Sequence, residues 1–586
     1  MDRRSFVKSA AIVPLSMANA KMIFGAFPGE ASGDAASEMH RGANQRFELT
    51  LRRVLDGDSP RFNQEFLLAD VKPAAERRFT EYGGDLSGRY IGALATAARV
   101  FGVETPGLDT LVERVIALQK PEGYFGAGFN FDKPTDAEMA LLWGNGRLLV
   151  GLLEYYQWKP SEPVLAASRR IGDFLLRISP LMLSRQIRDA FGAQHFASSY
   201  ICWTQQTEGL AKLYAVTKDE RYRKLAEDIS AVIERRPGDH VHGYLTSVRG
   251  VMDLYALTKD ERLLRQCETA WQEITASPDL LLSGGVPEGW SPNNHRTEGC
   301  AEADWVRLNL ALWKASGDAK YLAMAERAIF NELAFNQFAT GDFGHRVYTE
   351  TGLPAAGAAR AWWCCTLHGL RCFPDIQQNA FRLDAAVLRY EMPLGARIET
   401  GTLSASAEST LAQNGIVRIR IEKAGNERAR IAVRKPAWAE LVTMRLSGPG
   451  SIEPIDSGYV GAERVWNAGD VIELKYQMKL RPKPSTVSGR QSFWYGPWLL
   501  GASAEQNPAY FNELTLENRL IAGPGPMIDT ADKSAAFSIP IAATKMSYNQ
   551  AEYPDQPGTV HLRPIAEQTG QPTTSWEVRF LTRERG

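Results

Sequence analysis

The chain has 586 residues, about four times the size of an ordinary domain, so we expect several domains. Hydrophobic residues make up 44% and charged residues 23%, a composition that excludes a disordered or fibrous protein. The 67 lysines and arginines nearly balance the 68 aspartates and glutamates, so the net charge of −1 favours neither nucleic acid nor an anionic membrane as a partner. The 14 tryptophans are compatible with sugar binding, although most aromatic rings are expected in the core.

The N-terminus has the pattern of an export signal. Arg3 and Arg4 precede a short apolar run over residues 9–20, which ends in the small-residue sequence Ala18-Asn19-Ala20. This resembles a twin-arginine signal peptide and predicts a periplasmic or otherwise exported protein; a basic arm with no targeting role is the alternative. We assign residues 1–45 to this signal and a linker. No later segment reaches the roughly 18 apolar residues of a spanning helix, so we expect no integral membrane segment in the mature chain.

A repeated pattern runs through the first two-thirds of the chain. Residues 213–222 (LYAVTKDERY) recur as residues 254–263 (LYALTKDERL) and, more loosely, as residues 312–321. Each copy is typical of one helix ending, a polar turn and the next helix beginning, and the first offset of about 40 residues fits one helix–turn–helix unit. Further helical periodicity lies at 88–103, 107–119, 138–158 and 162–178, which predicts roughly ten to twelve helices between 85 and 340. Such hairpins can close into a toroid or stack into an open solenoid.

The third copy of the repeat comes later than the first offset would place it. The extra residues fall near 283–292 (SGGVPEGWSP), a segment rich in glycine and proline between predicted helices. Loops added at one end of a repeat array commonly carry function.

The pattern changes to strands near residue 385. Residues 417–421, 429–433 and 471–476 largely alternate apolar and polar side chains, with turns between them. This predicts a β-sandwich over residues 386–482, and the remaining stretch, 483–586, is long enough for a second one.

Three thiols and two carboxylates are concentrated in one part of the sequence. Glu298 and Cys300 lie just ahead of a predicted helix, Cys364 and Cys365 are adjacent, and Glu288 lies in the inserted loop. Three sulfurs and one carboxylate oxygen form a tetrahedral set suited to zinc, although the spacing matches no common zinc finger. From spacing alone, buried thiols or a strained vicinal disulfide remain alternatives. Zinc would keep a thiol deprotonated as a nucleophile, and a nearby carboxylic acid could protonate a leaving group, as in retaining glycoside hydrolysis.

The order of these residues resembles glycoside hydrolase family 127, the β-L-arabinofuranosidase family. The resemblance runs from about residue 60 to 510 and rests on Gly284-Gly285 with Glu288, the Glu298-x-Cys300 motif and the Cys364-Cys365 pair. The segments 119–125, 434–438, 458–470 and 495–497 also look like signatures of the family. The resemblance implies an (α/α)6 catalytic barrel over residues 46–385, followed by β-sandwich domains.

The resemblance also implies roles for the clustered residues. Cys364 would attack the anomeric carbon and, together with Glu298, Cys300 and Cys365, would hold Zn²⁺. Glu288 would be the general acid/base. An apolar setting near Trp290 would favour the protonated form that an acid needs.

The predicted sugar pocket departs from the family at three places. Members carry histidines that help to hold the arabinose hydroxyls, where this chain has Gly146-Arg147-Leu148, Trp203-Thr204-Gln205 and Thr246-Ser247-Val248-Arg249. We therefore expect a relative that acts on a β-L-arabinofuranoside-like or another glycoside of cell-wall glycans. Arg147 suits a substrate carrying a carboxylate, because a guanidinium presents a matching fork of donors; pairing with a neighbouring acid is the alternative.

Candidate substrate-binding residues are those near the catalytic set or at the altered positions: Arg147, Gln205, Trp290, His295 and Trp363. The other histidines of this half, His195, His240 and His242, are predicted to lie in loops as surface or capping residues.

Competing functions remain at this point. A non-catalytic periplasmic glycan-binding protein with a structural zinc is the main alternative, but it would have no use for Glu288. A lyase or sugar epimerase on the same barrel type, or a redox sensor, leaves the cluster less well explained. The expected partner is a carbohydrate, and the oligomeric state is not determined by the sequence.

Overall fold

The computed structural model describes most of the chain from residue 42 to residue 584. The described ranges are 42–56, 62–72, 79–192, 199–290, 296–348, 352–353, 360–384, 387–456, 458–485, 489–508, 517–522, 527–529, 536–544, 556–567 and 576–584. The predicted signal peptide, His195 and His295 lie outside these ranges.

Six helices form a closed inner ring. They are α3 (Asp85–Phe101), α5 (Asp136–Trp158), α9 (Gln206–Thr217), α11 (Val241–Thr258), α13 (Gly299–Ser316) and α16 (Trp363–Ala380). Each packs against the next in this order, and α16 packs against α3. Because the ring closes, the helical region is the predicted (α/α)6 barrel and not an open solenoid. The inner helices are buried over most of their length.

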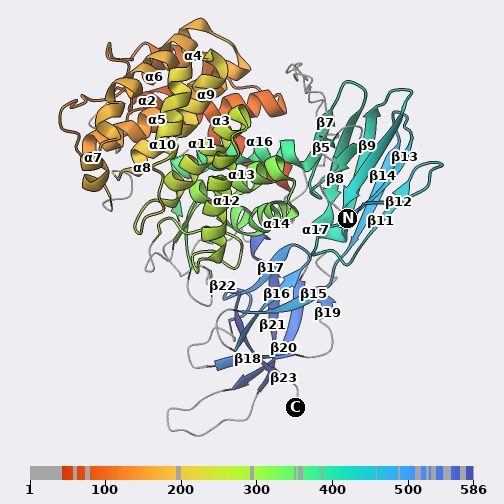
Figure 1. Ribbon diagram of the computed structural model, residues 1–586. Helices are drawn as coiled ribbons and strands as arrows, with labels where there is room; N and C mark the ends of the chain where they lie inside the picture. The colour runs from red at the N-terminus through yellow and green to blue at the C-terminus, as the bar shows by residue number, and fades with distance from the viewer. Residues whose placement is uncertain are drawn as a thin grey trace, which may run out of the picture.

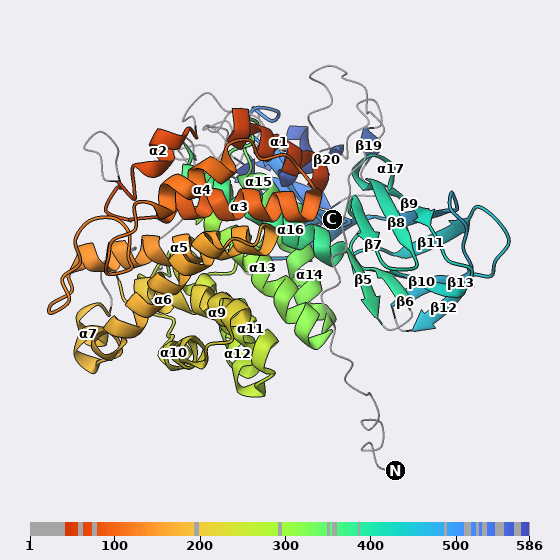
Figure 2. The same ribbon diagram turned by 90° about the horizontal axis from the view of Figure 1, so that it is seen from above.

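Six further helices lie outside the ring, each packed mainly against one inner helix. They are α1 (Ala43–Asp56), α4 (Leu108–Ile116), α6 (Glu162–Met182), α10 (Glu220–Ser230), α12 (Glu261–Ala276) and α14 (Ala319–Ala328). Short helices fill the connections: α2 (Gln64–Leu68), α7 (Arg185–Ala190), α8 (Ile201–Thr204), a π-helix (Ile329–Leu333) and α15 (Ala334–Asn336). Figures 1 and 2 show these helices as one domain, in red to green, with the strands beside and below it. The barrel thus starts at α1, a few residues before the expected residue 46.

The repeat in the sequence corresponds to three successive hairpins, α9–α10, α11–α12 and α13–α14. In each turn an aspartate caps the second helix by accepting a hydrogen bond from a backbone N–H two residues on: Asp219, Asp260 and Asp318. The residue before it closes the first helix in the left-handed conformation: Lys218 (φ 56°), Lys259 (φ 59°) and Gly317 (φ 71°).

The first β domain is a sandwich of two five-stranded sheets. One sheet has the order β12 (Glu453–Asp456), β13 (Tyr459–Val465), β10 (Arg428–Arg434), β6 (Val387–Tyr390), β5 (Phe381–Asp384). The other has the order β11 (Leu441–Leu446), β14 (Val471–Gln477), β9 (Ile416–Lys423), β8 (Ser404–Thr410), β7 (Ala396–Glu399), and the short helix α17 (Leu411–Asn414) joins β8 to β9. The predicted alternation is present, since Val417, Ile419 and Ile421 are buried and the arginines between them are exposed. The strands of this sandwich begin at β5, a few residues earlier than the expected domain boundary at residue 386.

The last domain contributes most of a ten-stranded sheet. Its strands are β15 (Leu480–Pro484), β16 (Arg490–Tyr495), β17 (Trp498–Ser503), β18 (Glu517–Ala522), β19 (Met527–Asp529), β20 (Ala536–Thr544), β21 (Gln556–Pro564), β22 (Trp576–Glu577) and β23 (Phe580–Glu584), and β3 (Gly352–Leu353) joins them from the helical region. The pairings β16–β23–β18–β20–β21–β17 return to β16, so these six strands close into a barrel where a sandwich was expected. A 3₁₀ turn (Ile565–Glu567) follows β21.

A small sheet brings the starts of two inner helices together. The segment inserted between α12 and α13 ends in β1 (Arg296–Glu298), which pairs with β2 (Gly344–Val347), and β2 pairs with β4 (Arg360–Ala361). Strand β1 leads directly into α13, and β4 leads into α16 after one residue. The first turns of α13 and α16 therefore lie at the same end of the barrel.

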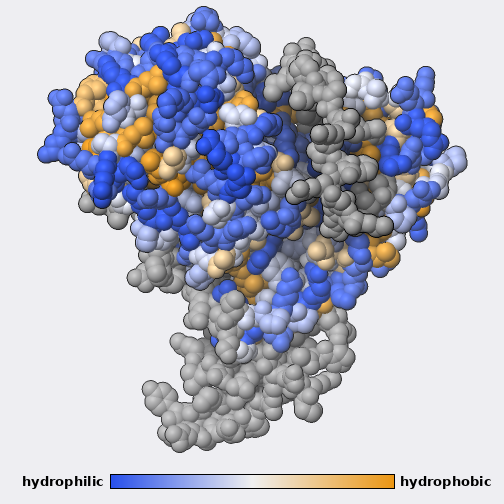
Figure 3. Space-filling model, viewed as in Figure 1, coloured by the Kyte–Doolittle hydropathy of each residue, from blue (hydrophilic) through white to orange (hydrophobic). Residues whose placement is uncertain are grey.

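The face of the molecule seen in Figure 3 is largely hydrophilic, with apolar patches scattered over it. Among the described residues, no helix combines the length and apolar character needed to cross a membrane.

The three turns make a test of the fold. Lys218→Gly should raise the free energy of unfolding of the barrel by about 0.5–1 kcal/mol, because glycine adopts the left-handed conformation without the steric cost that a β-carbon brings. Lys224→Gly, at an exposed position inside α10, should lower it by about 1 kcal/mol. Denaturant unfolding followed by helical circular dichroism measures both, and equal losses in the two variants would contradict the turn geometry.

Candidate active site

Glu288 lies in the inserted segment and is held by backbone hydrogen bonds on both sides. Its N–H donates to the carbonyl of Arg296 (2.8 Å), and its carbonyl accepts from the N–H of Val241 (2.9 Å). The side chain is buried, and its carboxylate contacts Nε of Arg296 and, at 3.3 Å, Nε2 of His345. The apolar setting predicted beside Trp290 is therefore wrong. Both basic partners come from the small sheet, whose pairing could not be read from the sequence.

The four predicted metal ligands converge where α13 and α16 begin. Glu298 is the N-terminal cap of α13 and Cys300 is in its first turn, while Cys364 and Cys365 are in the first turn of α16. Their ligand atoms all lie within 4.8 Å of one another, and Sγ of Cys365 is 3.7 Å from Oε1 of Glu298. All six cysteines of the chain are free, so the vicinal disulfide is wrong. Three sulfurs and one carboxylate oxygen at this separation fit a tetrahedral zinc ion.

The surroundings of Glu298 favour its ionised form. Nε2 of His240 is 2.8 Å from Oε2 of Glu298. Burial alone would raise the pKa of Glu298, but His240 beside it holds that pKa well below its usual value. Both helix N-termini also direct their partial positive charge at the sulfur atoms.

Among the three sulfurs, Cys364 has the surroundings that most favour a thiolate. Hydrogen bonds from the thiols of Cys300 and Cys365 lower the pKa of Cys364 well below its usual value. Burial raises the pKa of Cys300 and of Cys365. Cys364 is also the least buried of the three residues, since it is half-buried and the other two are buried.

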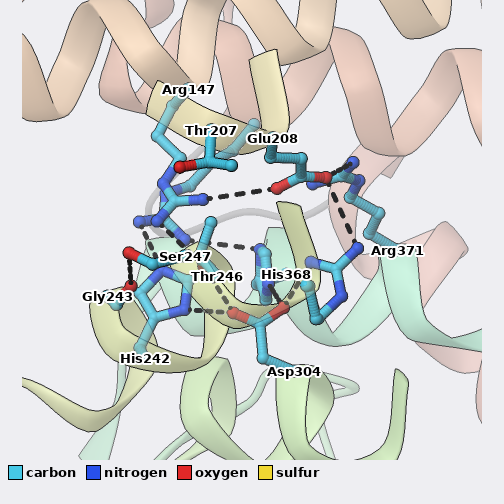
Figure 4. Close-up of polar contacts among 12 residues, drawn as sticks. Arg147, Thr207, Glu208, His242, Gly243, Thr246, Ser247, Asp304, His368 and Arg371 are labelled. Atoms are coloured by element: carbon cyan, nitrogen blue, oxygen red, sulfur yellow. Dashed lines mark hydrogen bonds and ion pairs between the residues drawn. The ribbon is translucent and has the colours of Figure 1, made fainter. Parts of the chain in front are cut away.

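A second buried cluster is centred on Asp304 (Figure 4). The carboxylate is fully buried and accepts four hydrogen bonds, from His242 Nδ1 (2.7 Å), His368 Nε2 (2.8 Å), Thr246 Oγ1 (2.8 Å) and Arg249 Nη1 (2.9 Å). Burial opposes ionisation here, but His368 and Arg249 keep the pKa of Asp304 well below its usual value.

The two histidines of this cluster are neutral. One ring nitrogen of each donates to Asp304, so the other accepts from Arg89, whose Nη2 is 3.0 Å from His242 Nε2 and whose Nη1 is 3.5 Å from His368 Nδ1. Burial lowers the pKa of His368 to about 3 and that of His242 well below its usual value, which agrees with this arrangement.

Arg89 connects this cluster to the sulfur atoms. Its Nε donates to Asp85 (2.7 Å), and its Nη1 lies 3.6 Å from Sγ of Cys300. The guanidinium is thus fixed by an acid and two neutral imidazoles, and it places one positive charge beside the thiols.

In the part of the chain that the structure describes, two other groups of side chains are close enough to hold a metal ion. In the group of His242, Asp304 and His368, the remaining nitrogens accept from Arg89, so the group fits a hydrogen-bond network and not a metal site. The other group, His240, Glu288 and Glu298, shares Glu298 with the sulfur set.

Arg147 lies in the barrel interior next to the Asp304 cluster. Its Nη2 donates to Thr246 Oγ1 (3.1 Å), its Nη1 is 3.9 Å from Glu208, and its guanidinium lies over the ring of Trp143. Glu208 is already held by Arg371 at 2.8 Å. Burial and, to a smaller extent, the nearby Arg89 lower the pKa of Arg147 to about 10, although Asp304 and Glu208 act in the opposite direction.

The other predicted substrate-binding residues have different settings. Gln205 is buried, and neither of its amide atoms has a hydrogen-bond partner among the described residues. Trp290 is buried against Tyr244, with the guanidinium of Arg235 over its ring, so it packs in the core of this end. Trp363 is half-buried among aromatic rings at the start of α16.

Several residues of the site were missed in the sequence. His240 and His242 were predicted to lie in loops, but His240 caps α11, His242 is in its first turn, and both are buried. Asp304 and His368 had a usable signal, because each follows a predicted cysteine ligand, Cys300 or Cys364, by four residues on the same helix. No sequence signal pointed to Arg89 or His345, since only the closed helical ring and the small sheet bring these residues to the site.

Comparisons with known proteins agree with this geometry. The family model of the β-L-arabinofuranosidase GH127 catalytic domain matches residues 75–378, more than half of the chain, and the model of the GH127 middle domain matches residues 392–478. No curated protein sequence gives a match.

Solved structures show the same fold. The chain is similar to a GH127 β-L-arabinofuranosidase from Geobacillus stearothermophilus T6, with a TM-score of 0.68 and 17% identity, over 93% of this chain and 99% of that one. It is also similar to a second solved GH127 β-arabinofuranosidase, with a TM-score of 0.67 and 16% identity, over 93% and 94% of the two chains. The two family models confirm the resemblance found in the sequence. The chain therefore belongs to the GH127 β-L-arabinofuranosidase family and is a glycoside hydrolase.

Proposed function

We propose that this protein is a zinc-dependent, retaining glycoside hydrolase with a cysteine nucleophile, acting on a β-L-arabinofuranoside or a related glycoside of cell-wall glycans. The observation that carries the proposal is the position of Glu298, which lies within 4.8 Å of both Cys364 and Glu288. The proposed nucleophile and the proposed acid therefore both lie next to one residue, and two groups that act on the same glycosidic bond must lie near each other in this way.

The reaction would proceed in two displacements at one carbon. The Sγ of Cys364 attacks the anomeric carbon while the glycosidic C–O bond breaks, and Glu288 gives its proton to the leaving oxygen. Glu288 then takes a proton from water, whose oxygen attacks the same carbon and releases the Cys364 sulfur. Arg296 and His345 hold the Glu288 carboxyl in place throughout.

Glu298, Cys300, Cys364 and Cys365 would hold the zinc ion, which when bound keeps the thiols deprotonated near neutral pH. The chain itself contributes the Arg89 charge and two helix N-termini at the same place.

We also propose export through the twin-arginine route. This proposal rests on the sequence alone, and cell fractionation would test it.

The donor set predicts the metal content. The purified protein should contain about one zinc per chain, and Cys300→Ser should lower this several-fold, because it removes one of the four ligands. Cys267→Ser, at a buried cysteine of α12 whose thiol donates to the carbonyl of Val248, is the control and should keep the zinc. Elemental analysis measures both, and metal-free active protein would refute the site.

The proposed roles predict different kinetics for two variants. Cys364→Ala should lower kcat by at least about 10³-fold for every substrate, because it removes the nucleophile. Glu288→Gln should slow substrates with poor leaving groups by about 10²–10⁴-fold and spare activated aryl glycosides in the first step. Product configuration, followed by NMR, should be retained. A product of inverted configuration would eliminate the covalent route. Unchanged activity in Cys364→Ala would show that Cys364 is not the nucleophile and would leave the metal only a structural role.

The charge at Arg147 predicts a preference among glycosides. We propose that it favours a substrate carrying a carboxylate, since Glu208 lies 3.9 Å from Arg147 and is held more closely by Arg371 and Arg249. Arg147→Gln should then lower kcat/KM for an acidic glycoside by about 10-fold or more and change little for the neutral amide of the same compound. Equal turnover of the two compounds by the unmodified enzyme would show that Arg147 serves only the internal network.

A further inference from the structure

Two buried carboxylates without a part in the proposed reaction support the loop that carries Glu288. Glu332 accepts hydrogen bonds from Ser283 Oγ (2.6 Å) and from Thr297 Oγ1 (3.0 Å). Glu302 accepts one from the backbone N–H of Val286 (2.9 Å). Both carboxylates are almost completely buried.

The contacts of Glu332 lie at the two ends of the loop. Ser283 stands five residues before Glu288, and Thr297 stands at its far end, in β1. Backbone bonds complete the closure, because the N–H of Glu288 donates to Arg296 and Pro287 forms a bridge with Thr297. One carboxylate therefore joins both ends of the segment that presents the acid.

The loop backbone lies directly on these carboxylates. A β-carbon on Gly285 would stand 2.3 Å from Cγ of Glu332 and 2.8 Å from Oε1 of Glu302, distances that only glycine avoids. The loop therefore cannot move closer to the two carboxylates, and the hydrogen bonds from Ser283 and Val286 oppose movement away from them.

The turn that holds Glu332 is itself fixed by the last domain. Glu332 belongs to the π-helix Ile329–Leu333, a kind of irregular turn that is frequent at functional sites. Its neighbour Asn331 donates to the carbonyl of Pro497 (2.9 Å) and accepts from the N–H of Leu499 in β17 (2.7 Å). Figure 1 shows β17 next to the end of α14, where the π-helix starts.

We propose that Glu332 is a positioning residue for Glu288, and that the last β domain supports it through Asn331. The proposal rests on the proposed function, in which Glu288 is the acid/base. An acid displaced by about 1 Å from the leaving oxygen loses about 10²-fold in rate, so a support of this kind governs proton donation without touching the substrate. The last domain is then part of the catalytic apparatus.

The structural half of the proposal is tested by hydrogen exchange on the full-length, zinc-loaded protein. Glu332→Ala should speed exchange in the peptide covering residues 283–290, and Asn331→Ala should do so to a smaller extent. Glu391→Ala, at an equally buried carboxylate that accepts from Tyr459 in the sandwich, is the matched control and should leave this peptide unchanged. Should Glu332→Ala fail to fold, Ser283→Ala removes the same contact from the other side. Unchanged exchange in Glu332→Ala or Ser283→Ala would overturn the proposal, and unchanged exchange in Asn331→Ala would remove the last domain from it.

The catalytic half is tested with a series of aryl β-L-arabinofuranosides that differ in leaving-group pKa. Glu332→Ala should lower kcat/KM by about 10- to 100-fold for poor leaving groups, with good ones nearly unchanged and zinc content preserved. When Glu288→Gln is already present, adding Glu332→Ala should not lower kcat/KM further. An equal loss for every leaving group, or full additivity, would overturn the proposal. If the unmodified protein hydrolyses none of the series, the proposed function fails for this substrate, while hydrogen exchange still decides whether Glu332 positions the loop.

Discussion

Four groups that bind a metal ion as anions are brought into one buried space at the end of a helical barrel. Glu298, Cys300, Cys364 and Cys365 cannot all be charged there without compensation, because burial in a low-dielectric interior disfavours every uncompensated ion. The structure supplies part of the compensation through Arg89, His240 and two helix N-termini. A divalent cation would supply the rest. Much of the surrounding architecture follows from this requirement.

Two successive turns of the helices α13 and α16 provide both the anionic groups and the support for their positive counter-charge. Their first turns provide the sulfur ligands, and their next turns provide Asp304 and His368, which with His242 hold Arg89 in place. A single pair of adjacent inner helices thus builds both the anionic cluster and the support for its counter-charge. The small sheet β1–β2–β4 keeps the two helix starts together and brings His345 to Glu288.

Local patterns predicted much of this molecule. The hairpin turns were visible because an aspartate cap after a left-handed residue leaves a recurring sequence, and β9 was visible because a half-buried strand alternates. The candidate ligand set could be proposed from the adjacent Cys364 and Cys365, the Glu298-x-Cys300 motif and the resemblance to the family. Ring closure, the closed last barrel and the partners of Glu288 could not be predicted, because they depend on pairings between residues far apart in the chain. Arg89 stands 211 positions from the Cys300 sulfur that it contacts.

X-ray absorption at the zinc edge of the purified full-length protein tests the central claim most directly. The account predicts about three sulfur neighbours at about 2.3 Å and one oxygen at about 2.0–2.2 Å, with one sulfur fewer in Cys365→Ser. A sulfur-free coordination shell, or a metal whose sulfur count does not change in Cys365→Ser, would contradict it.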